Sequence, residues 1–176
     1  MSERPAPHRA YLSLGANVDP ARNLQAAVEA LGRFGHVRAA STVWQTAPLG
    51  FTAQPDFLNA VVLLETPLSA QALREQAIAA IEQQLGRVRT ANKNGPRTID
   101  IDIMLFDHAV LDLDGRHIPD PEVLERPFVA LPLAEIAPDE MHPETGQTFR
   151  QIAARFDPEA ANMHPRKDVV LLETKR

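Results

Sequence analysis

Two aspartates with one residue between them, Asp100 and Asp102, lie in a segment with the alternating apolar pattern of a β-strand. Side chains at positions i and i+2 of a strand project from the same face, so both carboxylates point the same way. The residues between and beside them point into apolar packing: Ile99, Ile101 and Ile103. Two like charges next to a buried strand are costly unless they are neutralised, and Mg²⁺ favours a few carboxylate oxygens with phosphates and water. The alternative is a solvated acidic pair that forms salt bridges with nearby arginines.

A basic segment precedes this strand directly. Between Gly86 and Thr98 there are four positive charges and no acid, at Arg87, Arg89, Lys93 and Arg97. Guanidinium groups beside metal-binding carboxylates suit a polyphosphate, because the metal bridges some of its oxygens and the arginines bind the others. A solvated basic loop is the simpler interpretation, but its position next to the aspartates favours phosphate chemistry. No Walker-type phosphate loop is present.

A second pair at positions i and i+2, Phe57 and Asn59, shares one face of another predicted strand. An aromatic ring and an amide edge together suit a flat heteroaromatic ligand. Alternatively, Phe57 belongs to the core and Asn59 satisfies a neighbouring backbone group. These two residues alone do not decide between the two interpretations.

Length and composition limit the possibilities further. The chain has 176 residues, a formal net charge of -5 and no cysteine, which excludes disulfide scaffolds, thiolate metal sites and cysteine nucleophiles. The longest apolar run, Ala60 to Leu64, is far short of a membrane span, and the first ten residues lack the apolar stretch of a signal peptide. We therefore expect a cytoplasmic protein with one domain over residues 1–176.

The elements that must position these residues follow the order β-α-β-β-α-β. Strands are predicted over 10–14, 37–45, 57–65 and 98–106, and helices over 20–31 and 69–85. Asp19 as N-cap and Pro20 at the first helical position mark the start of the first helix, and Gly86 ends the second. This order predicts an α+β fold with a ferredoxin-like antiparallel sheet and helices packed on it.

The sequence signal weakens after residue 114. Residues 110–113 are a candidate hairpin partner of the strand over 98–106, and helical pieces over 122–125 and 129–136 are expected to be broken by Pro127 and Pro132. The C-terminal extension, 146–176, has no assigned role. For it we expect a packing helix over 148–156 and a late strand over 169–172.

Together, six segments between residues 11 and 139 carry a family resemblance. They are YLSLGAN (11–17), TAPLG (46–50), QPDFLN (54–59), GRVR (86–89), GPRTIDIDIMLF (95–106) and RPFV (126–129). Their types and order resemble the 6-hydroxymethyl-7,8-dihydropterin pyrophosphokinases of folate biosynthesis. The segment 95–102 is the most specific, because a proline, an arginine and both aspartates stand at fixed offsets.

The resemblance implies a diphosphokinase that transfers pyrophosphate from ATP to the hydroxymethyl group of the reduced pterin and releases AMP. It implies two Mg²⁺ ions on Asp100 and Asp102, and catalytic arginines at Arg87 and Arg97. The pterin is expected to contact Thr46, Leu49, Phe57, Asn59 and Phe128. The nucleotide is expected to contact Glu82, Arg89, Ile103 and Arg126. ATP and the pterin are the implied partners of a monomer or weak dimer, without nucleic acid or membrane.

Two positions depart from the family pattern. Asn94 stands where some members carry tryptophan, so an aromatic lid from that residue is missing. Asp120 replaces a common histidine that contacts the nucleotide phosphates, and an acid there repels ATP unless it faces away or assists a metal. Phe57 replaces a tyrosine of some members and keeps the stacking face.

Two other classes of function share parts of this pattern. A two-metal nucleotidyltransferase also places paired aspartates on a strand, but it releases pyrophosphate rather than AMP. A ferredoxin-like RNA-binding module has the same order of elements, but it uses a run of aromatic residues that this sequence lacks.

Overall fold

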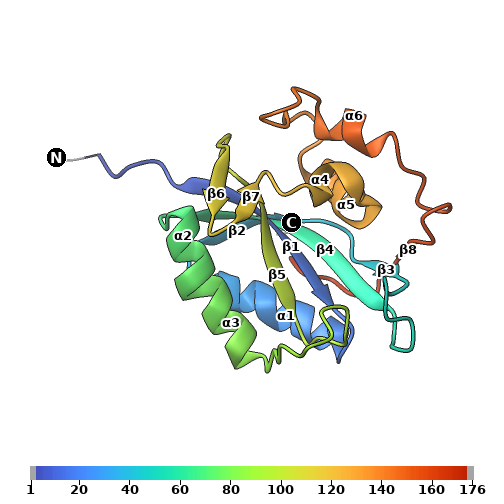
Figure 1. Ribbon diagram of the computed structural model, residues 1–176. Helices are drawn as coiled ribbons and strands as arrows, with labels where there is room; N and C mark the ends of the chain where they lie inside the picture. The colour runs from blue at the N-terminus through green and yellow to red at the C-terminus, as the bar shows by residue number, and fades with distance from the viewer. Residues whose placement is uncertain (1–2, 174–176) are drawn as a thin grey trace.

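The computed structural model describes residues 3–173, and a six-stranded antiparallel sheet organises them (Figure 1). Strand β1 (His8–Ala16) lies in its centre, between β4 (Phe57–Thr66) and β5 (Asp100–Phe106). The far side of β4 pairs with β2 (His36–Ala40) and with β3 (Trp44–Thr46), and β3 also pairs with β8 (His164–Pro165). The ferredoxin-like α+β fold is therefore confirmed.

One face of the sheet is covered by the two predicted helices. Helix α1 (Pro20–Leu31) is followed after three strands by a continuous helical segment, made of α2 (Ala70–Ala72), the π-helical η1 (Leu73–Ile78) and α3 (Ala79–Gln84). Alternate residues of β1 and β4 pack against these helices, and the core they share includes Leu12, Leu14, Leu24, Leu64, Leu73 and Ile81. Gly86, with a φ of 76°, ends this helical segment as the sequence predicted.

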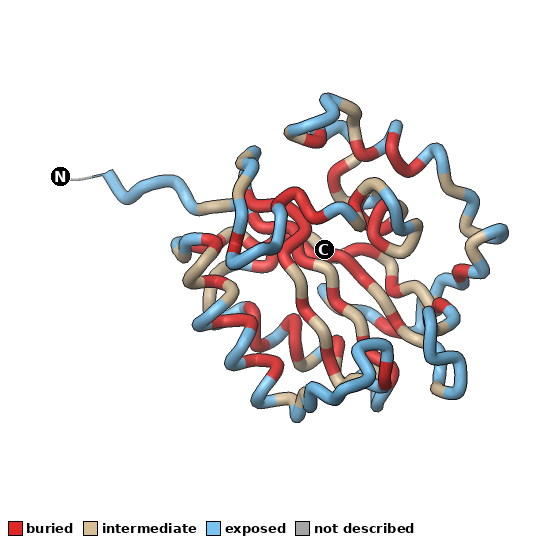
Figure 2. The backbone as a smooth tube through the Cα atoms, viewed as in Figure 1, coloured by how far each residue is buried: buried red, intermediate tan, exposed pale blue. Residues whose placement is uncertain are grey.

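The opposite face is covered by the chain beyond residue 114. Helices α4 (Glu122–Glu125), α5 (Pro127–Ile136) and α6 (Phe149–Ala153) lie on it, and Figure 1 shows them on the other side of the sheet from α1. A second apolar cluster joins them to the strands through Tyr11, Val61, Leu63, Met104, Leu133 and Phe149. Figure 2 shows the resulting line of buried backbone along the central strands. The packing helix expected in the C-terminal extension is α6.

A small hairpin stands beside the edge strand β5. It pairs β6 (Leu111–Leu113) with β7 (Arg116–Ile118), so the prediction that residues 110–113 pair with the strand over 98–106 is wrong. Asp114 and Gly115 both have positive φ, which supplies the tight two-residue turn that closes a hairpin. That turn brings the chain back onto β6 rather than onto β5.

The strand predicted over 37–45 is divided into β2 and β3. Ser41 lies between them, and its hydroxyl oxygen accepts a hydrogen bond from the backbone N–H of Val61, 2.9 Å away. The side chain thus takes the place of a regular ladder contact, and the strand is interrupted there.

Asp19 occupies the predicted N-cap position, although it has a φ of 43° and its side chain makes no capping hydrogen bond. Two smaller expectations are wrong. Pro132 lies inside α5 without ending it, because the helix is held by its packing on β4 and loses only one backbone hydrogen bond there. Residues 169–172 form no strand; Val169 is buried against the core as irregular chain.

Within residues 3–173, no helix combines the length and the apolar character needed to cross a membrane.

Phe149 tests whether the C-terminal extension is part of the folded core. Its ring is 2% exposed and makes an edge contact with Tyr11, with ring centroids 6.1 Å apart. We expect Phe149→Ala to lower the free energy of unfolding by about 3–5 kcal/mol, because the cavity left inside the core cannot fully collapse. Urea unfolding followed by circular dichroism measures this, with the half-exposed Met141→Ala as a control that changes little. A small loss for Phe149→Ala would contradict the packing of α6 on the sheet.

Candidate active site

The site residues lie on one face of three neighbouring strands. In β-sheet register, Gly15 of β1 is opposite Asn59 on one side and Asp100 on the other. Ser13, two residues earlier, is opposite Asp102. The predicted amide and both predicted carboxylates therefore project from the face that α5 and α6 cover only in part, at its polar end.

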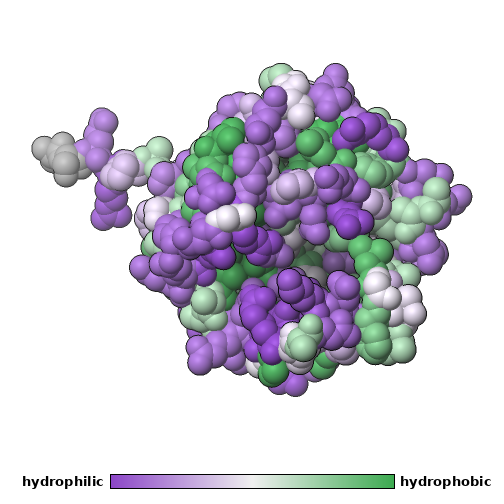
Figure 3. Space-filling model, viewed as in Figure 1, coloured by the Kyte–Doolittle hydropathy of each residue, from purple (hydrophilic) through white to green (hydrophobic). Residues whose placement is uncertain are grey.

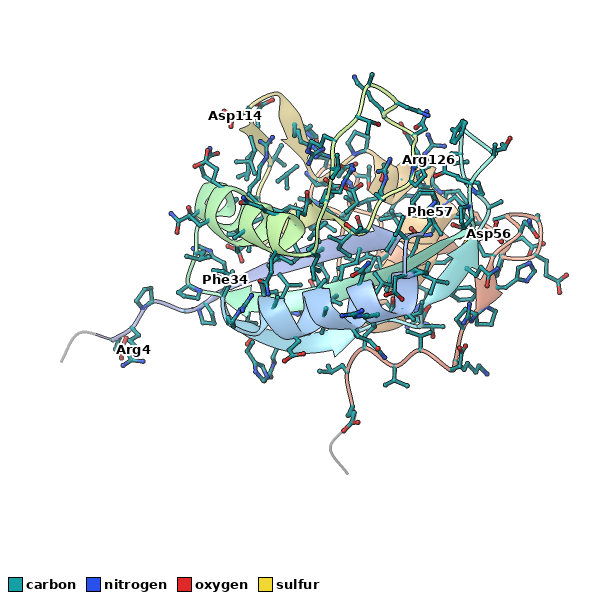
Figure 4. All side chains as sticks on the ribbon, turned by 90° about the horizontal axis from the view of Figure 1, so that it is seen from below. Arg4, Phe34, Asp56, Phe57, Asp114 and Arg126 are labelled. Atoms are coloured by element: carbon teal, nitrogen blue, oxygen red, sulfur yellow. The ribbon has the colours of Figure 1, made fainter. Side chains whose placement is uncertain are left out.

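A cavity of about 180 Å³ lies over this polar end. Its lining includes all five residues expected to contact the pterin, which are Thr46, Leu49, Phe57, Asn59 and Phe128. Arg97 and both aspartates line it as well. Asn94, the position without the family's tryptophan, also lines it. The visible face in Figure 3 is hollowed near its centre between mainly hydrophilic side chains, and Figure 4 shows Phe57 at the end of the sheet.

Asn59 is held in place by its neighbours. Its amide nitrogen donates to the Thr46 hydroxyl over 2.7 Å, which orients the amide plane. Gly15 stands beside it, and a Cβ on this glycine would lie 3.0 Å from Asn59 Oδ1. The glycine thus keeps open the space in front of the amide oxygen, which is the space that a flat ligand needs.

Arg97 occupies the region between the ring of Phe57 and the first aspartate. Its guanidinium carbon lies 5.7 Å from the ring centroid, and one terminal nitrogen donates to Asp100 over 2.8 Å. The side chain is 17% exposed. A cation over an aromatic face and against a carboxylate is stabilised by both. Arg97 therefore occupies the space that a ligand stacked on Phe57 would need.

Two loops meet above the cavity. The buried Asn17 side chain donates to Gln54 Oε1 at 2.9 Å and accepts from the backbone N–H of Arg97 at 2.9 Å. Gln54 in turn donates to the carbonyl of Asn94. These bonds tie the loop that follows β3 to the basic segment 87–97, so the two loops are positioned together.

A second cavity of about 160 Å³ meets the first at Asp102, which lines both. Three residues expected to contact the nucleotide line it: Glu82, Arg89 and Ile103. The hairpin contributes Arg116 and His117, and the turn before α4 contributes Asp120. Its lining combines three arginines, three acids and several apolar residues.

The two aspartates are each paired with an arginine. Arg97 binds Asp100, and Arg116 donates to Asp102 over 2.7 Å. Burial, followed by the negative charge of Asp100, raises the pKa of Asp102 above its ordinary value, and the Arg116 guanidinium opposes this shift. The carboxylate of Asp102 is therefore poorly stabilised when no further positive charge is present.

Asp120 is also accompanied by positive charge. Arg116 lies 3.7 Å from one of its oxygens, and the other oxygen accepts the backbone N–H of Glu122 over 2.9 Å. The acid that departs from the family pattern is thus partly balanced by an arginine four residues before it.

Glu82 supports the strand that carries the aspartates. One carboxylate oxygen accepts the backbone N–H of Ile101 over 3.2 Å, and the other lies 3.3 Å from Arg89. Burial raises the pKa of Glu82, and Asp100 adds to this, whereas the bond from Ile101 lowers it. Because Ile101 lies between the two aspartates, this bond fixes the backbone on which both project.

Arg87 and Arg126 line neither cavity in this conformation. Arg87 donates to the carbonyl of Val88, and its buried Nε has no hydrogen-bond partner among the described residues. Burial lowers the pKa of Arg87 from its ordinary value. Arg126 is exposed at the junction of α4 and α5, where Figure 4 labels it. Among the described residues neither arginine forms a salt bridge with the aspartates, although the charge of Asp100 acts on Arg87.

The donor set agrees with Mg²⁺ held together with a phosphate ligand. Residues 3–173 contain no group of three or more histidine, aspartate and glutamate side chains arranged to hold a metal by themselves. Asp100 and Asp102 offer two carboxylates on one cavity wall, and Mg²⁺ typically takes one or two carboxylates and completes its shell with phosphates and water. The residues present therefore fit Mg²⁺ that arrives with a polyphosphate.

Comparison with known proteins gives the family. Residues 11–138 match the model of 7,8-dihydro-6-hydroxymethylpterin-pyrophosphokinase. The chain belongs to this family. A Methylorubrum extorquens protein named 2-amino-4-hydroxy-6-hydroxymethyldihydropteridine pyrophosphokinase is 43% identical over 153 residues, which cover 85% of this chain and 94% of the relative. A Pseudomonas aeruginosa protein of the same name is 42% identical over 134 residues, which cover 74% of this chain and 82% of the relative. The expected family, enzyme class and folate-pathway function are confirmed.

A solved structure agrees in fold. The Plasmodium falciparum HPPK-DHPS chain, crystallised with pterin and p-hydroxybenzoate, superposes with a TM-score of 0.69 at 15% sequence identity. The alignment covers 88% of this pyrophosphokinase chain and 42% of the Plasmodium chain.

Several residues of the pyrophosphokinase site were missed by the sequence interpretation. Arg116 and Glu122 line the second and the first cavity, respectively, and Asn17 and Gln54 tie the loops together. The spacing of Arg116 from Asp120 was the available signal, since an arginine four residues from an unexpected acid suggests a compensating charge. No sequence signal places Glu122 in the same cavity as Asp102, twenty positions earlier.

The pH dependence of stability tests the electrostatics at Glu122. Burial, followed by the charges of Asp120 and Asp102, raises its pKa from 4.5 to about 6. Between these values the folded chain binds a proton that the unfolded chain does not, so the free energy of unfolding falls as the pH rises through this window. We expect Glu122→Gln to lack this loss and to be more stable than the parent chain at pH 7, by at most ~2 kcal/mol.

Urea unfolding at pH 4.5 and pH 7, with a chelator present, measures the difference. Glu82 and Asp102 are unchanged in both proteins, so the comparison isolates Glu122. Equal pH dependence of the two proteins would contradict its raised pKa.

Proposed function

We propose that this chain transfers the β,γ-pyrophosphoryl group of ATP to the hydroxymethyl oxygen of 6-hydroxymethyl-7,8-dihydropterin across the junction of its two cavities. The observation that carries the proposal is the row formed by Asn59, Gly15 and Asp100 across three strands. It places an amide edge and an aromatic face at one end of the cavity and carboxylates at the other. Asp102 is shared with the second cavity, where Arg74, Arg89 and Arg116 lie and where we place the triphosphate.

The pterin-binding roles follow from the chemistry of the first cavity. Phe57 and Phe128 offer two aromatic faces, and Asn59 presents its amide, oriented by Thr46, to the edge of the ring. Leu49 contributes apolar surface from the loop after β3. A pterin held in this way directs its hydroxymethyl group toward the aspartates.

Asp100 and Asp102 are proposed to hold two Mg²⁺ ions together with the triphosphate. Bound there, the metal neutralises charge on the transferred group and lowers the pKa of a coordinated oxygen. Burial of the aspartates in a partly closed cavity strengthens these electrostatic interactions. The raised pKa of Asp102 follows from the same burial, together with the neighbouring charge of Asp100.

Arg97 is proposed to change partners during the reaction. In the structure it lies over Phe57 and binds Asp100. When the pterin stacks on Phe57 and the aspartates bind metal, this guanidinium is released and is available to the phosphates. Three further arginines are proposed to bind phosphate when the basic segment closes over the nucleotide: Arg87, Arg89 and Arg126. The buried Nε of Arg87 has no hydrogen-bond partner among the described residues and is available for this contact.

The reaction then depends on positioning and charge rather than on a strong base. The attacking hydroxyl is a weak nucleophile and the transferred group is anionic, so in-line placement and charge neutralisation supply the rate enhancement. ATP and the reduced pterin are the proposed partners; a monomer or weak dimer and a cytoplasmic location remain predictions.

Product analysis tests the activity and the aspartates together. The chain, incubated with ATP, Mg²⁺ and the reduced pterin, should release AMP and form the pterin diphosphate, as measured by chromatography. We expect Asp100→Asn and Asp102→Asn to abolish turnover while circular dichroism shows an unchanged fold. Release of pyrophosphate with a nucleotidylated product would instead indicate a nucleotidyltransferase, and near-normal turnover of either variant would contradict its metal-binding role.

Arg97→Ala tests the proposed change of partner. Loss of a guanidinium that stabilises transition-state charge lowers kcat by a factor of about 10³ to 10⁵. Steady-state kinetics with separately varied ATP and pterin measure this, and unfolding curves control for stability. An effect confined to KM would limit Arg97 to ground-state binding.

A further inference from the structure

Arg116 links two acids at the mouth of the second cavity. It is the first residue of β7, and one terminal nitrogen donates to Asp102 over 2.7 Å. The other terminal nitrogen lies 3.7 Å from Asp120. Its side chain is 50% exposed, whereas those of Asp102 and Asp120 are 21% and 11% exposed. The arginine therefore covers two more deeply placed carboxylates from the solvent side.

The hairpin that carries Arg116 is held in place by other contacts. Arg74, on the helix beside it, donates to the carbonyl of Leu113 over 2.6 Å. The backbone N–H of Gly115 donates to Asp112 over 2.8 Å and stabilises the turn. The bond from Arg116 to Asp102 is thus not required to place β7, and the side chain is free to exchange partners without displacing the hairpin.

Asp120 is fixed more firmly than Arg116. Its backbone N–H donates to the carbonyl of Met104, and one carboxylate oxygen accepts the N–H of Glu122. The oxygen that remains is the one near Arg116. Asp120 therefore holds the guanidinium close to the cavity even when Arg116 leaves Asp102.

A divalent cation on Asp102 changes the balance at Arg116. The guanidinium and the cation then compete for one carboxylate and repel each other across a partly buried space. A triphosphate removes this conflict, because guanidinium groups bind phosphate oxygens with charge-assisted hydrogen bonds. The same arginine thus opposes binding of the bare cation and favours binding of the nucleotide.

We propose that Arg116 is an exchangeable counterion, which pairs with Asp102 in the metal-free protein and moves to a phosphate oxygen when the metal–nucleotide complex binds, with Asp120 as its fixed neighbour. The proposal rests on the proposed roles of Asp102 in metal binding and of the second cavity in nucleotide binding. It also explains how the chain accommodates an acid at position 120, since the positive charge comes from Arg116.

Replacing Arg116 should change two affinities in opposite directions. For Arg116→Met we expect binding of Mn²⁺ alone, measured by electron paramagnetic resonance, to tighten about three- to tenfold because the competing charge is gone. Binding of a non-hydrolysable ATP analogue with Mg²⁺, measured by calorimetry, should weaken about tenfold or more. Arg116→Lys should restore part of both effects. If Arg116 had only a structural role, its replacement would not tighten the binding of Mn²⁺ while weakening the binding of the ATP analogue.

Arg38→Met is the matched control. Arg38 of β2 has a similarly exposed side chain, at 54%, and pairs with Glu65 of the neighbouring strand β4. Its replacement changes the net charge by the same amount, and Arg38 lines neither cavity. Both affinities should stay within about twofold of the parent chain. Parallel changes, or none, in Arg116→Met would overturn the proposal even if AMP is formed normally. A parent chain that binds Mn²⁺ neither alone nor with the analogue would contradict the metal site, and this inference with it.

Discussion

The repulsion between two carboxylates on one strand face is the constraint around which this molecule is arranged. Asp100 and Asp102 project from β5 into a partly closed cavity, where each is accompanied by one arginine. The pairing lowers the cost of the charges, but the pKa of Asp102 still lies above its ordinary value. The two arginines bind these carboxylates but are equally suited to binding phosphate. The site therefore suits a ligand in which a metal cation is bound to a polyphosphate.

The fold serves this constraint by dividing one face of the sheet. At one end, Tyr11, Val61 and Met104 are buried under α5 and α6. At the other end, the same face carries Ser13, Gly15, Asn59 and the aspartates, and helices cover it only in part. Because alternate residues of the same strands also form the core beneath α1 and α3, the positions of the site residues are determined by apolar packing on both faces.

The parts of this arrangement that depend on local sequence could be predicted, and the parts that depend on distant contacts could not. The alternation around Asp100 and Asp102 correctly placed them on one face, and the order of elements gave the sheet topology. Ser41 interrupts a strand through a bond to β4, and the Asp114–Gly115 turn redirects β6 to β7; both outcomes depend on tertiary partners. The pairing of Arg116 with Asp102, fourteen positions apart, belongs to the same class.

Crystals of the protein with Mn²⁺ and a non-hydrolysable ATP analogue provide the most direct test, because the anomalous signal of manganese locates the metal independently of the model for the nucleotide. The account predicts metal peaks coordinated by carboxylate oxygens of both Asp100 and Asp102, with the triphosphate in the cavity that these residues border. A bound nucleotide whose metal lies away from both aspartates would contradict it.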